Sequence, residues 1–164
     1  MSKGERDCCS GVRLEAITAE VVTQLAKYEA TSTSWPWGEA KMLQSLSSEH
    51  HCYVLVEDKA IGYCVLLLID EVLEILNFVI FSEFQGRGYG RLLVDKIKAV
   101  ARDLGASMLW LEVRADNHRA RKVYLSAEFS ETGIRKNYYP NLTGSHTKSP
   151  QDAVLMQCAL EISS

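Results

Sequence analysis

The hydrophobic positions of the chain follow two different periods, which separates predicted strands from predicted helices. Residues 52–81 are rich in Val, Ile, Leu and Tyr and are interrupted at Asp58-Lys59 and at Asp70-Glu71, which predicts three strands. Because their connections are short, these strands are expected to pair antiparallel.

The second half of the chain alternates between the two periods. Apolar residues recur at helical spacing from Tyr89 to Leu104, Gly105 stands where a left-handed helix end is expected, and residues 107–113 read as a buried strand. A strand, a helix and a strand in this order imply a parallel pair. Further strands are expected over residues 11–17, 129–138 and 153–161. Further helices are expected over residues 19–29 after a cap at Thr18, from about Gly38, and from a cap at Asp116 or Asn117 to Tyr124.

Together these elements predict an α/β (α+β) fold with a mixed, mostly antiparallel seven-stranded sheet and about four helices. The chain of 164 residues is long enough for one well-packed core and short for two. We therefore expect one domain over residues 11–164, preceded by a flexible N-terminus over residues 1–10.

The charge balance and the cysteines limit the possible partners. The 18 Lys and Arg residues against 21 Asp and Glu residues disfavour non-specific binding of nucleic-acid phosphates. The five cysteines show no CxxC spacing, and no cluster of metal ligands stands out, so no metal is expected. No apolar run is long enough to span a bilayer, and the first residues lack the apolar core of a signal peptide. We expect a cytoplasmic protein with no membrane partner and no direct nucleic-acid partner.

Three glycines alternate within residues 85–90 (QGRGYG), between a predicted strand and the clearest predicted helix. A glycine-rich turn at a helix start points backbone N–H groups at an anion, although such glycines also make tight turns without a ligand. The spacing is not the GxGxxG of dinucleotide-binding folds, and the loop does not end in the GK[ST] of a P-loop. We favour a pyrophosphate as the ligand and disfavour a nucleoside triphosphate.

The same stretch matches the Gln/Arg-x-x-Gly-x-Gly/Ala signature of the GCN5-related N-acetyltransferases (GNAT), whose strand order is also the one expected above. The blocks LWLEVRADNHRARKVY (109–124), IRKNYYP (134–140) and DAVLM (152–156) resemble the bacterial RimI type, as does WPW (35–37). The resemblance covers about residues 12–162. It implies a GNAT fold, acetyl-coenzyme A as cosubstrate, and an enzyme that acetylates the N-terminal alanine of a small-subunit ribosomal protein. We expect the protein to be a monomer.

The resemblance also implies two catalytic residues. Glu112 matches the glutamate that takes the proton of the amine, and apolar neighbours would suit it to that role; the alternative is a salt-bridged glutamate, for example with Arg114. Tyr124 matches the proton donor to the departing thiolate, and its alternative is core packing. His118 is expected to face solvent, and no cysteine is expected to act as a nucleophile.

Binding residues follow from the same resemblance. The strand around Val79 corresponds to the one that binds pantetheine and polarises the thioester carbonyl, and Asn117 matches a pantetheine ligand as well as a helix cap. The expected cofactor-binding residues are Phe78, Val79, Ile80, Gln85, Gly86, Arg87, Gly88, Tyr89, Gly90, Arg91 and Asn117. The expected substrate-binding residues are Trp35, Trp37, Tyr138 and Tyr139, of which the fold alone would bury at least two.

The chain departs from the family pattern at two places. Glu128 replaces a turn glycine, so the backbone there is expected to avoid a glycine-type conformation. Residues 141–151 form a longer loop near the expected peptide site, which leaves the acceptor more open than the reaction type. The alternatives are acetylation of a lysine or a small amine, a non-catalytic acetyl-coenzyme A sensor, and a covalent acetyl-cysteine route.

Overall fold

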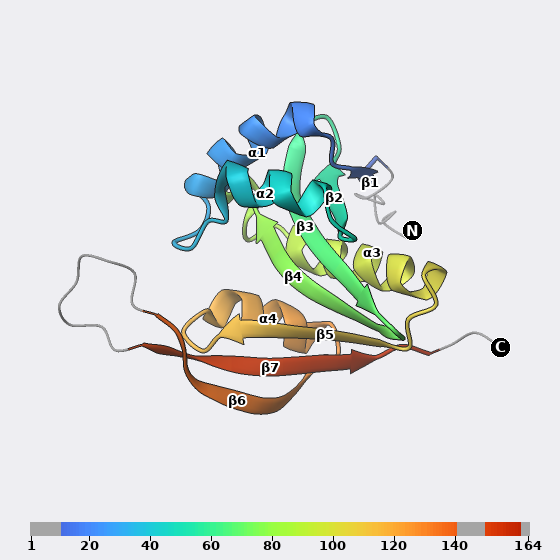
Figure 1. Ribbon diagram of the computed structural model, residues 1–164, viewed down its shortest axis with the longest axis vertical. Coiled ribbons are helices and arrows are strands. Elements are labelled where there is room, and N and C mark those ends of the chain that lie inside the picture. The colour runs from blue at the N-terminus through green and yellow to red at the C-terminus, as the bar shows by residue number, and fades with distance from the viewer. Residues whose placement is uncertain (1–10, 141–149, 162–164) are drawn as a thin grey trace, which may run out of the picture.

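The computed structural model describes residues 11–140 and 150–161 (Figure 1). In chain order its elements are β1 (Arg13–Ala16), α1 (Ala19–Ala30), α2 (Gly38–Leu46), β2 (His51–Val56), β3 (Ala60–Ile69), β4 (Val72–Ile80), a 3₁₀ turn (Ser82–Phe84), α3 (Tyr89–Asp103), β5 (Met108–Arg114), α4 (His118–Ser126), β6 (Ser130–Tyr139) and β7 (Gln151–Ala159).

The strands form one seven-stranded sheet in the order β1-β2-β3-β4-β5-β7-β6. Neighbouring strands are antiparallel except β4 and β5, which are parallel and are joined through α3. The predicted fold class is confirmed, including the parallel pair within a mostly antiparallel sheet. The predicted helix and strand bounds agree with the structure to within a few residues.

Helices cover both faces of the sheet, and each face has its own hydrophobic core. On one face, α1 and α2 place Val22, Leu25 and Met42 against residues of β2 and β3. On the other face, α3 and α4 pack against β4, β5 and β7, with Leu93 and Ile97 fully buried. Figure 1 shows α1 and α2 over the β2–β4 half, so the β5–β7–β6 half is left without a helix on that face.

The sheet opens between its two parallel strands. β4 and β5 are paired only from Val72 to Ile75 and from Met108 to Leu111, and beyond these residues they diverge (Figure 1). A β-bulge at Leu76, where the β3–β4 register shifts, lies at the point of divergence. Bulges bend the strand that carries them and are common beside functional sites. The opening is the natural place for a site, because it leaves strand edges without partners.

Three local expectations have clear outcomes. Asn117 caps α4, since its Oδ1 accepts a hydrogen bond from the Ala120 N–H at 3.2 Å, as predicted. Thr18 stands at the N-cap of α1 without a side-chain cap bond. The expectation for Glu128 is wrong: its φ of 70° lies in the left-handed region that favours glycine.

Two expected features, the N-terminus at residues 1–10 and most of the loop at 141–151, lie outside the described residues. No helix in the part of the chain that the structure describes combines the length and the apolar character needed to cross a bilayer.

Candidate active site

Two cavities meet along the opening between β4 and β5. The larger has a volume of about 440 Å³ and the smaller about 180 Å³. They share a wall formed by Thr33, Trp35, Phe78, Val79, Asn117 and Ala120. A molecule in one cavity therefore lies next to a molecule in the other. We call the larger the cofactor cavity and the smaller the acceptor cavity.

Residues 85–90, which we call the glycine loop, line one end of the cofactor cavity. Gly86 and Gly88 have φ angles of 75° and 85°, which side-chain-bearing residues rarely adopt, and both line the cavity. α3 starts at Tyr89 directly behind them and carries no acidic residue in its first turn. The first N–H groups of a helix lack intrahelical partners, and the helix dipole is positive there. This end of the cavity suits an anion, as the motif predicts.

Gln85 ties the loop to its surroundings. Its Nε2 donates hydrogen bonds to the Ile80 carbonyl at 2.8 Å and to the Ser32 carbonyl at 3.2 Å, and its Oε1 accepts one from the Arg119 guanidinium. One side chain thus joins the end of β4, the loop after α1, and α4. Arg119, which also lines the cofactor cavity, gave no signal in the sequence.

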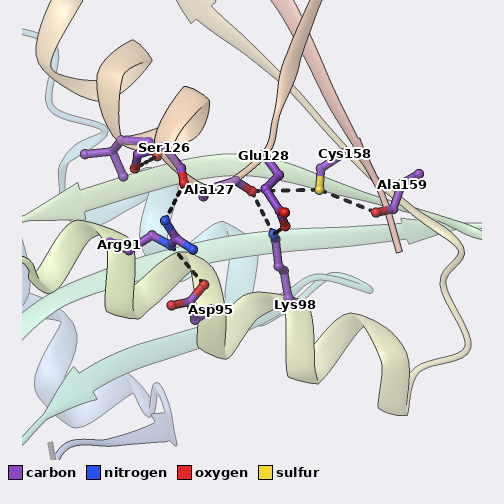
Figure 2. A network of polar contacts seen from close by, with 9 residues as sticks. Arg91, Asp95, Lys98, Ser126, Ala127, Glu128, Cys158 and Ala159 are labelled. Atoms are coloured by element: carbon purple, nitrogen blue, oxygen red, sulfur yellow. Dashed lines mark hydrogen bonds and ion pairs between the residues drawn. The ribbon is translucent and has the colours of Figure 1, made fainter. Parts of the chain in front are cut away.

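Arg91 is already engaged by protein groups. Its guanidinium donates hydrogen bonds to the Asp95 carboxylate at 3.2 Å and to the Ser126 carbonyl (Figure 2). Nearby, Lys98 Nζ donates a hydrogen bond to the Ala127 carbonyl at 2.7 Å. The bonds to the Ser126 and Ala127 carbonyls hold α3 against the end of α4. Arg91 still lines the cofactor cavity and adds a positive charge to it.

Most of the predicted cofactor residues lie together in this cavity. The lining includes Phe78, Val79, Ile80, Gln85, Gly86, Gly88, Gly90, Arg91 and Asn117. Two predicted residues do not line it. The Tyr89 ring packs against Phe84 with centroids 5.8 Å apart, and the Arg87 guanidinium lies 6.0 Å from the same ring.

Glu112 lies in the acceptor cavity and is ion-paired. Its side chain is 12% exposed, and its Oε1 accepts a hydrogen bond from Arg135 Nη1 at 2.6 Å. The expected alternative partner, Arg114, is wrong: Arg114 pairs with Asp116 at 3.2 Å. The partner comes instead from β6, two strands away.

A second carboxylate lies near Glu112. Burial and the neighbouring charge of Glu112 raise the pKa of Glu74 on β4 above its ordinary value. This effect places two acidic side chains within electrostatic range of each other, on the strands that flank the opening. No motif in the sequence marks Glu74 as a site residue.

Tyr124 lines the acceptor cavity and is also part of the core. Its side chain is buried, and its ring contacts those of Phe78 and Phe129 at centroid distances of 5.4 and 5.5 Å. Burial raises the pKa of Tyr124 well above that of a free phenol. The two readings of this residue, core packing and a place at the site, are therefore compatible.

Aromatic side chains wall the acceptor cavity. Trp35, Trp37 and Tyr139 line it, and the Arg114 guanidinium joins two of them by stacking 4.1 Å from the Trp35 ring and 5.0 Å from the Tyr139 ring. Tyr138 is not in the lining; it is 43% exposed and lies under Arg135. None of the four is buried, so the expectation that at least two are core residues is wrong.

The remaining candidates lie away from the cavities. His118 is exposed, as expected. Cys52, Cys64 and Cys158 are free and buried, and none lines either cavity, while Cys8 and Cys9 lie outside the described residues. Within residues 11–140 and 150–161, no three His, Cys, Asp or Glu side chains gather closely enough to hold a metal ion.

Comparison with known proteins gives consistent matches. The profile of the Acetyltransferase (GNAT) family matches residues 21–129. The [ribosomal protein bS18]-alanine N-acetyltransferase of Haemophilus influenzae is 32% identical over 126 residues, which cover 76% of this chain and 83% of that protein.

Solved structures share the fold. The ribosomal-protein-S18-alanine N-acetyltransferase of Escherichia coli superposes with a TM-score of 0.81 at 23% identity, covering 93% of this chain and 96% of that one. A GNAT family acetyltransferase from Elizabethkingia anophelis, solved with acetyl-CoA bound, gives a TM-score of 0.73 at 22% identity over 92% and 99% of the two chains.

Proposed function

Because the chain belongs to the GNAT acetyltransferase family, we propose that it transfers the acetyl group of acetyl-coenzyme A to the N-terminal α-amine of a protein. The proposed acceptor is the N-terminal alanine of a small-subunit ribosomal protein, as the name of the Haemophilus relative states for that enzyme. The observation that carries the proposal is the shared wall between a cavity with an anion cradle and a cavity with a carboxylate. We propose that the enzyme acts as a monomer in the cytoplasm.

The residues of the cofactor cavity fit acetyl-coenzyme A. The glycine loop, the start of α3 and the guanidinium groups of Arg91 and Arg119 suit its pyrophosphate. Beyond Ile75, β4 has no partner strand on its β5 side, so its backbone groups and the Asn117 side chain are available to the pantetheine arm. The cofactor supplies the acetyl group as a reactive thioester.

Glu112 is the proposed base. A free α-amino group has a pKa of about 8, so part of it is neutral at cellular pH and only one proton must be removed during transfer. The partly buried carboxylate of Glu112 accepts that proton, directly or through a water molecule. Arg135 donates a hydrogen bond to the same carboxylate and holds it in the acceptor cavity. The amine nitrogen forms the new C–N bond directly, without an acyl-enzyme.

Tyr124 is the proposed proton donor. Its raised pKa keeps the phenol protonated throughout the neutral range, which a donor to a departing thiolate requires. The proton passes to the coenzyme A sulfur as the C–S bond breaks. The backbone N–H near Val79, on the shared wall, is proposed to polarise the acetyl carbonyl.

The acceptor cavity favours a chain terminus over a lysine side chain. Trp35, Trp37 and Tyr139 leave a space of only about 180 Å³. A lysine amine, with a pKa of about 10.4, is almost fully protonated at neutral pH and demands a stronger base. We therefore place acetylation of lysine or of a small amine second.

The decisive experiment uses a panel of synthetic peptides with different first residues and one internal lysine. Each is incubated with acetyl-coenzyme A and mapped by fragmentation mass spectrometry. We expect acetylation of the α-amine, highest for Ala, and no reaction of the same peptide with a blocked N-terminus. Acetylation of the lysine in preference to every terminus would overturn the proposal. Tight binding of acetyl-coenzyme A without transfer to any amine would favour a sensor.

A further inference from the structure

A buried carboxylate lies behind the wall of the acceptor cavity. Glu29, near the end of α1, is 0% exposed. It accepts hydrogen bonds from the backbone N–H groups of Trp37 and Gly38 at 2.9 and 3.0 Å, from the Tyr63 hydroxyl at 2.6 Å, and from Asn77 Nδ2 at 3.3 Å. Four donors from three separate segments thus converge on one side chain.

The network continues into the strand that walls both cavities. Asn77 Nδ2 also donates to the Tyr63 hydroxyl at 2.6 Å, and Asn77 Oδ1 accepts from the Phe78 N–H at 3.0 Å. Asn77 directly follows the bulge at Leu76, where β4 leaves β5. Glu29 therefore connects the loop between α1 and α2 to the part of β4 that borders the acetyl-transfer site.

A purely structural role does not account for a carboxylate at this position. None of the ion pairs formed by the described residues includes Glu29, so its desolvation is offset by neutral donors alone. Replacing a buried polar cluster by apolar groups of similar shape is often neutral or stabilising. The carboxylate instead positions the backbone, because its two oxygens accept hydrogen bonds from the N–H groups of Trp37 and Gly38, where α2 begins.

The loop that Glu29 holds carries two walls of the acceptor cavity. Trp35 and Trp37 both line that cavity. The other end of the loop is held from the cofactor side, where Ser32 Oγ accepts from the Ser82 N–H at 2.9 Å and the Ser32 carbonyl accepts from Gln85. The loop is thus fixed at both ends, and Glu29 fixes the end that faces the acceptor.

We propose that Glu29 is a positioning residue for the acceptor. Through Trp37, Gly38 and Asn77 it holds the loop between α1 and α2 (residues 31–37, the tryptophan loop) at a set distance from β4. This inference rests on the proposed function, since it assigns the cavity to the amine acceptor. Glu29 touches neither cavity, so it acts through the residues that it binds.

The test is Glu29→Gln, measured with the best peptide acceptor of the wild type. The amide keeps the size of the side chain but turns one acceptor into a donor that faces another donor. Hydrogen bonds to charged groups are among the stronger ones, so we expect the peptide KM to rise about 10- to 100-fold. The dissociation constant of acetyl-coenzyme A should change by less than about twofold, because Gln85 and the glycine loop at the anion end of the cofactor cavity are held by bonds outside the Glu29 network.

Two further variants separate positioning from general loss of stability. Glu39→Gln is the matched control: this carboxylate also joins α1 to α2, by accepting from Thr23 Oγ1 at 2.7 Å, but it lies outside the network, and its KM values should equal those of the wild type. Tyr63→Phe removes one donor and should raise the peptide KM in the same direction by a smaller factor. If Glu29→Gln folds poorly, Tyr63→Phe still carries the test.

The outcomes distinguish this inference from the proposed function. A wild-type peptide KM in Glu29→Gln overturns the inference, as does an equal rise for peptide and cofactor. If the wild type prefers a lysine or small-amine acceptor, the proposed function fails, and the KM comparison is made with that acceptor. If it transfers to no amine, hydrogen exchange decides: Glu29→Gln should accelerate exchange over residues 31–38 alone, and unchanged exchange there overturns the inference.

Discussion

The two cavities of the site are built in different ways. The cofactor cavity takes more than half of its lining residues from one run of chain, residues 78–91, and three of these residues are glycines. The acceptor cavity is assembled from side chains of five separate segments, from the tryptophan loop to Tyr139 on β6. The first therefore depends on local backbone conformation, and the second depends on how distant elements pack and pair.

This difference indicates which properties of the enzyme are robust to substitution. A backbone cradle changes little when surface side chains change, so recognition of the cofactor is expected to be insensitive to most substitutions outside the glycine loop. A wall of aromatic side chains held by Arg114 and by the Glu29 network is sensitive to substitutions at many positions. Substitutions in the two cavities should accordingly have separable effects on the two substrates.

Glu112→Gln is expected to show the largest difference between the effect on turnover and the effect on cofactor affinity. The amide cannot accept a proton, so kcat should fall by about 10²- to 10⁴-fold. The affinity for acetyl-coenzyme A should remain unchanged, because Glu112 lines only the acceptor cavity. Steady-state kinetics and calorimetric titration measure the two quantities. Glu131→Gln is the control, since Glu131 pairs with Arg121 at 2.6 Å away from both cavities. Wild-type turnover in Glu112→Gln would exclude this glutamate as the base.

A second prediction concerns folding stability at alkaline pH, which should depend on tyrosines in and behind the acceptor cavity. Burial raises the pKa of Tyr124 in the acceptor cavity and of Tyr63 behind it. The unfolded chain loses these protons near pH 10, whereas the folded chain retains them. The stabilisation is thus fully present below pH 10 and is lost as the pH rises further, by about 1.4 kcal/mol per pH unit for each tyrosine.

Urea unfolding at several pH values between 9 and 11 measures this loss. Tyr124→Phe should reduce the slope of unfolding free energy against pH by up to about 1.4 kcal/mol per pH unit, because one raised group is then absent. Part of the slope should remain, since the pKa values of Tyr63, Tyr139 and Cys64 are also raised by burial. An unchanged slope in that variant would show that other groups cause the alkaline loss.

Arg114→Leu tests how the aromatic wall is held. The substitution removes the stacking on Trp35 and Tyr139, and cation–π contacts contribute about 0.5 to 2 kcal/mol each. The peptide KM should therefore rise about 5- to 10-fold at constant affinity for acetyl-coenzyme A. Lys41→Leu removes a comparable contact, 4.0 Å from the centroid of the Trp37 ring, but Lys41 lines neither cavity and Glu29 still binds the Trp37 backbone, so both parameters should stay unchanged. An equal loss of cofactor affinity in Arg114→Leu would mean that the two cavities are not held independently.

Gly88→Ala tests the cofactor cavity in the opposite direction. A Cβ at this glycine meets no atom within 4 Å, so the cost is the strain of a φ of 85°, about 1 to 2 kcal/mol. If the loop relieves this strain by changing conformation, acetyl-coenzyme A must restore it, and its affinity should fall about fivefold. Gly105→Ala imposes similar strain at a φ of 81° at the far end of α3 and should leave the affinity unchanged. If Gly88→Ala instead raised the peptide KM and left the affinity for acetyl-coenzyme A normal, the two cavities would not bind the two substrates as proposed.

The difference between local chain conformation and the packing of distant segments also explains which features the sequence could predict. The succession of strands along the chain, the parallel pair and the glycine loop follow from local patterns, and the loop residues Gly86 and Gly88 line the cavity. The partner of Glu112 was wrong because it depends on the pairing of β5 with β7 and of β7 with β6. Glu29 was missed because a single glutamate in an amphipathic helix gives no sign that four donors from distant segments surround it.

The smallest effect is expected outside both cavities, at the turn between α4 and β6. Glu128 has a φ of 70°, so Glu128→Gly should relieve backbone strain and raise the unfolding free energy by about 0.5 to 1 kcal/mol, while KM values stay constant. The lost contact with Lys98 is long, at 3.4 Å, and the Glu128 side chain is 82% exposed, so it contributes little (Figure 2).

Lys98 itself keeps its bond to the Ala127 carbonyl at 2.7 Å. Glu128→Ala, which loses the contact but keeps the strain, separates the two contributions in the same urea titrations. If both variants are destabilised equally, the contact with Lys98 outweighs the strain, and α3 is held to this turn by a side-chain ion pair. If only the glycine variant gains stability, the backbone conformation at residue 128 decides the stability of this turn, and the side-chain contact with Lys98 does not.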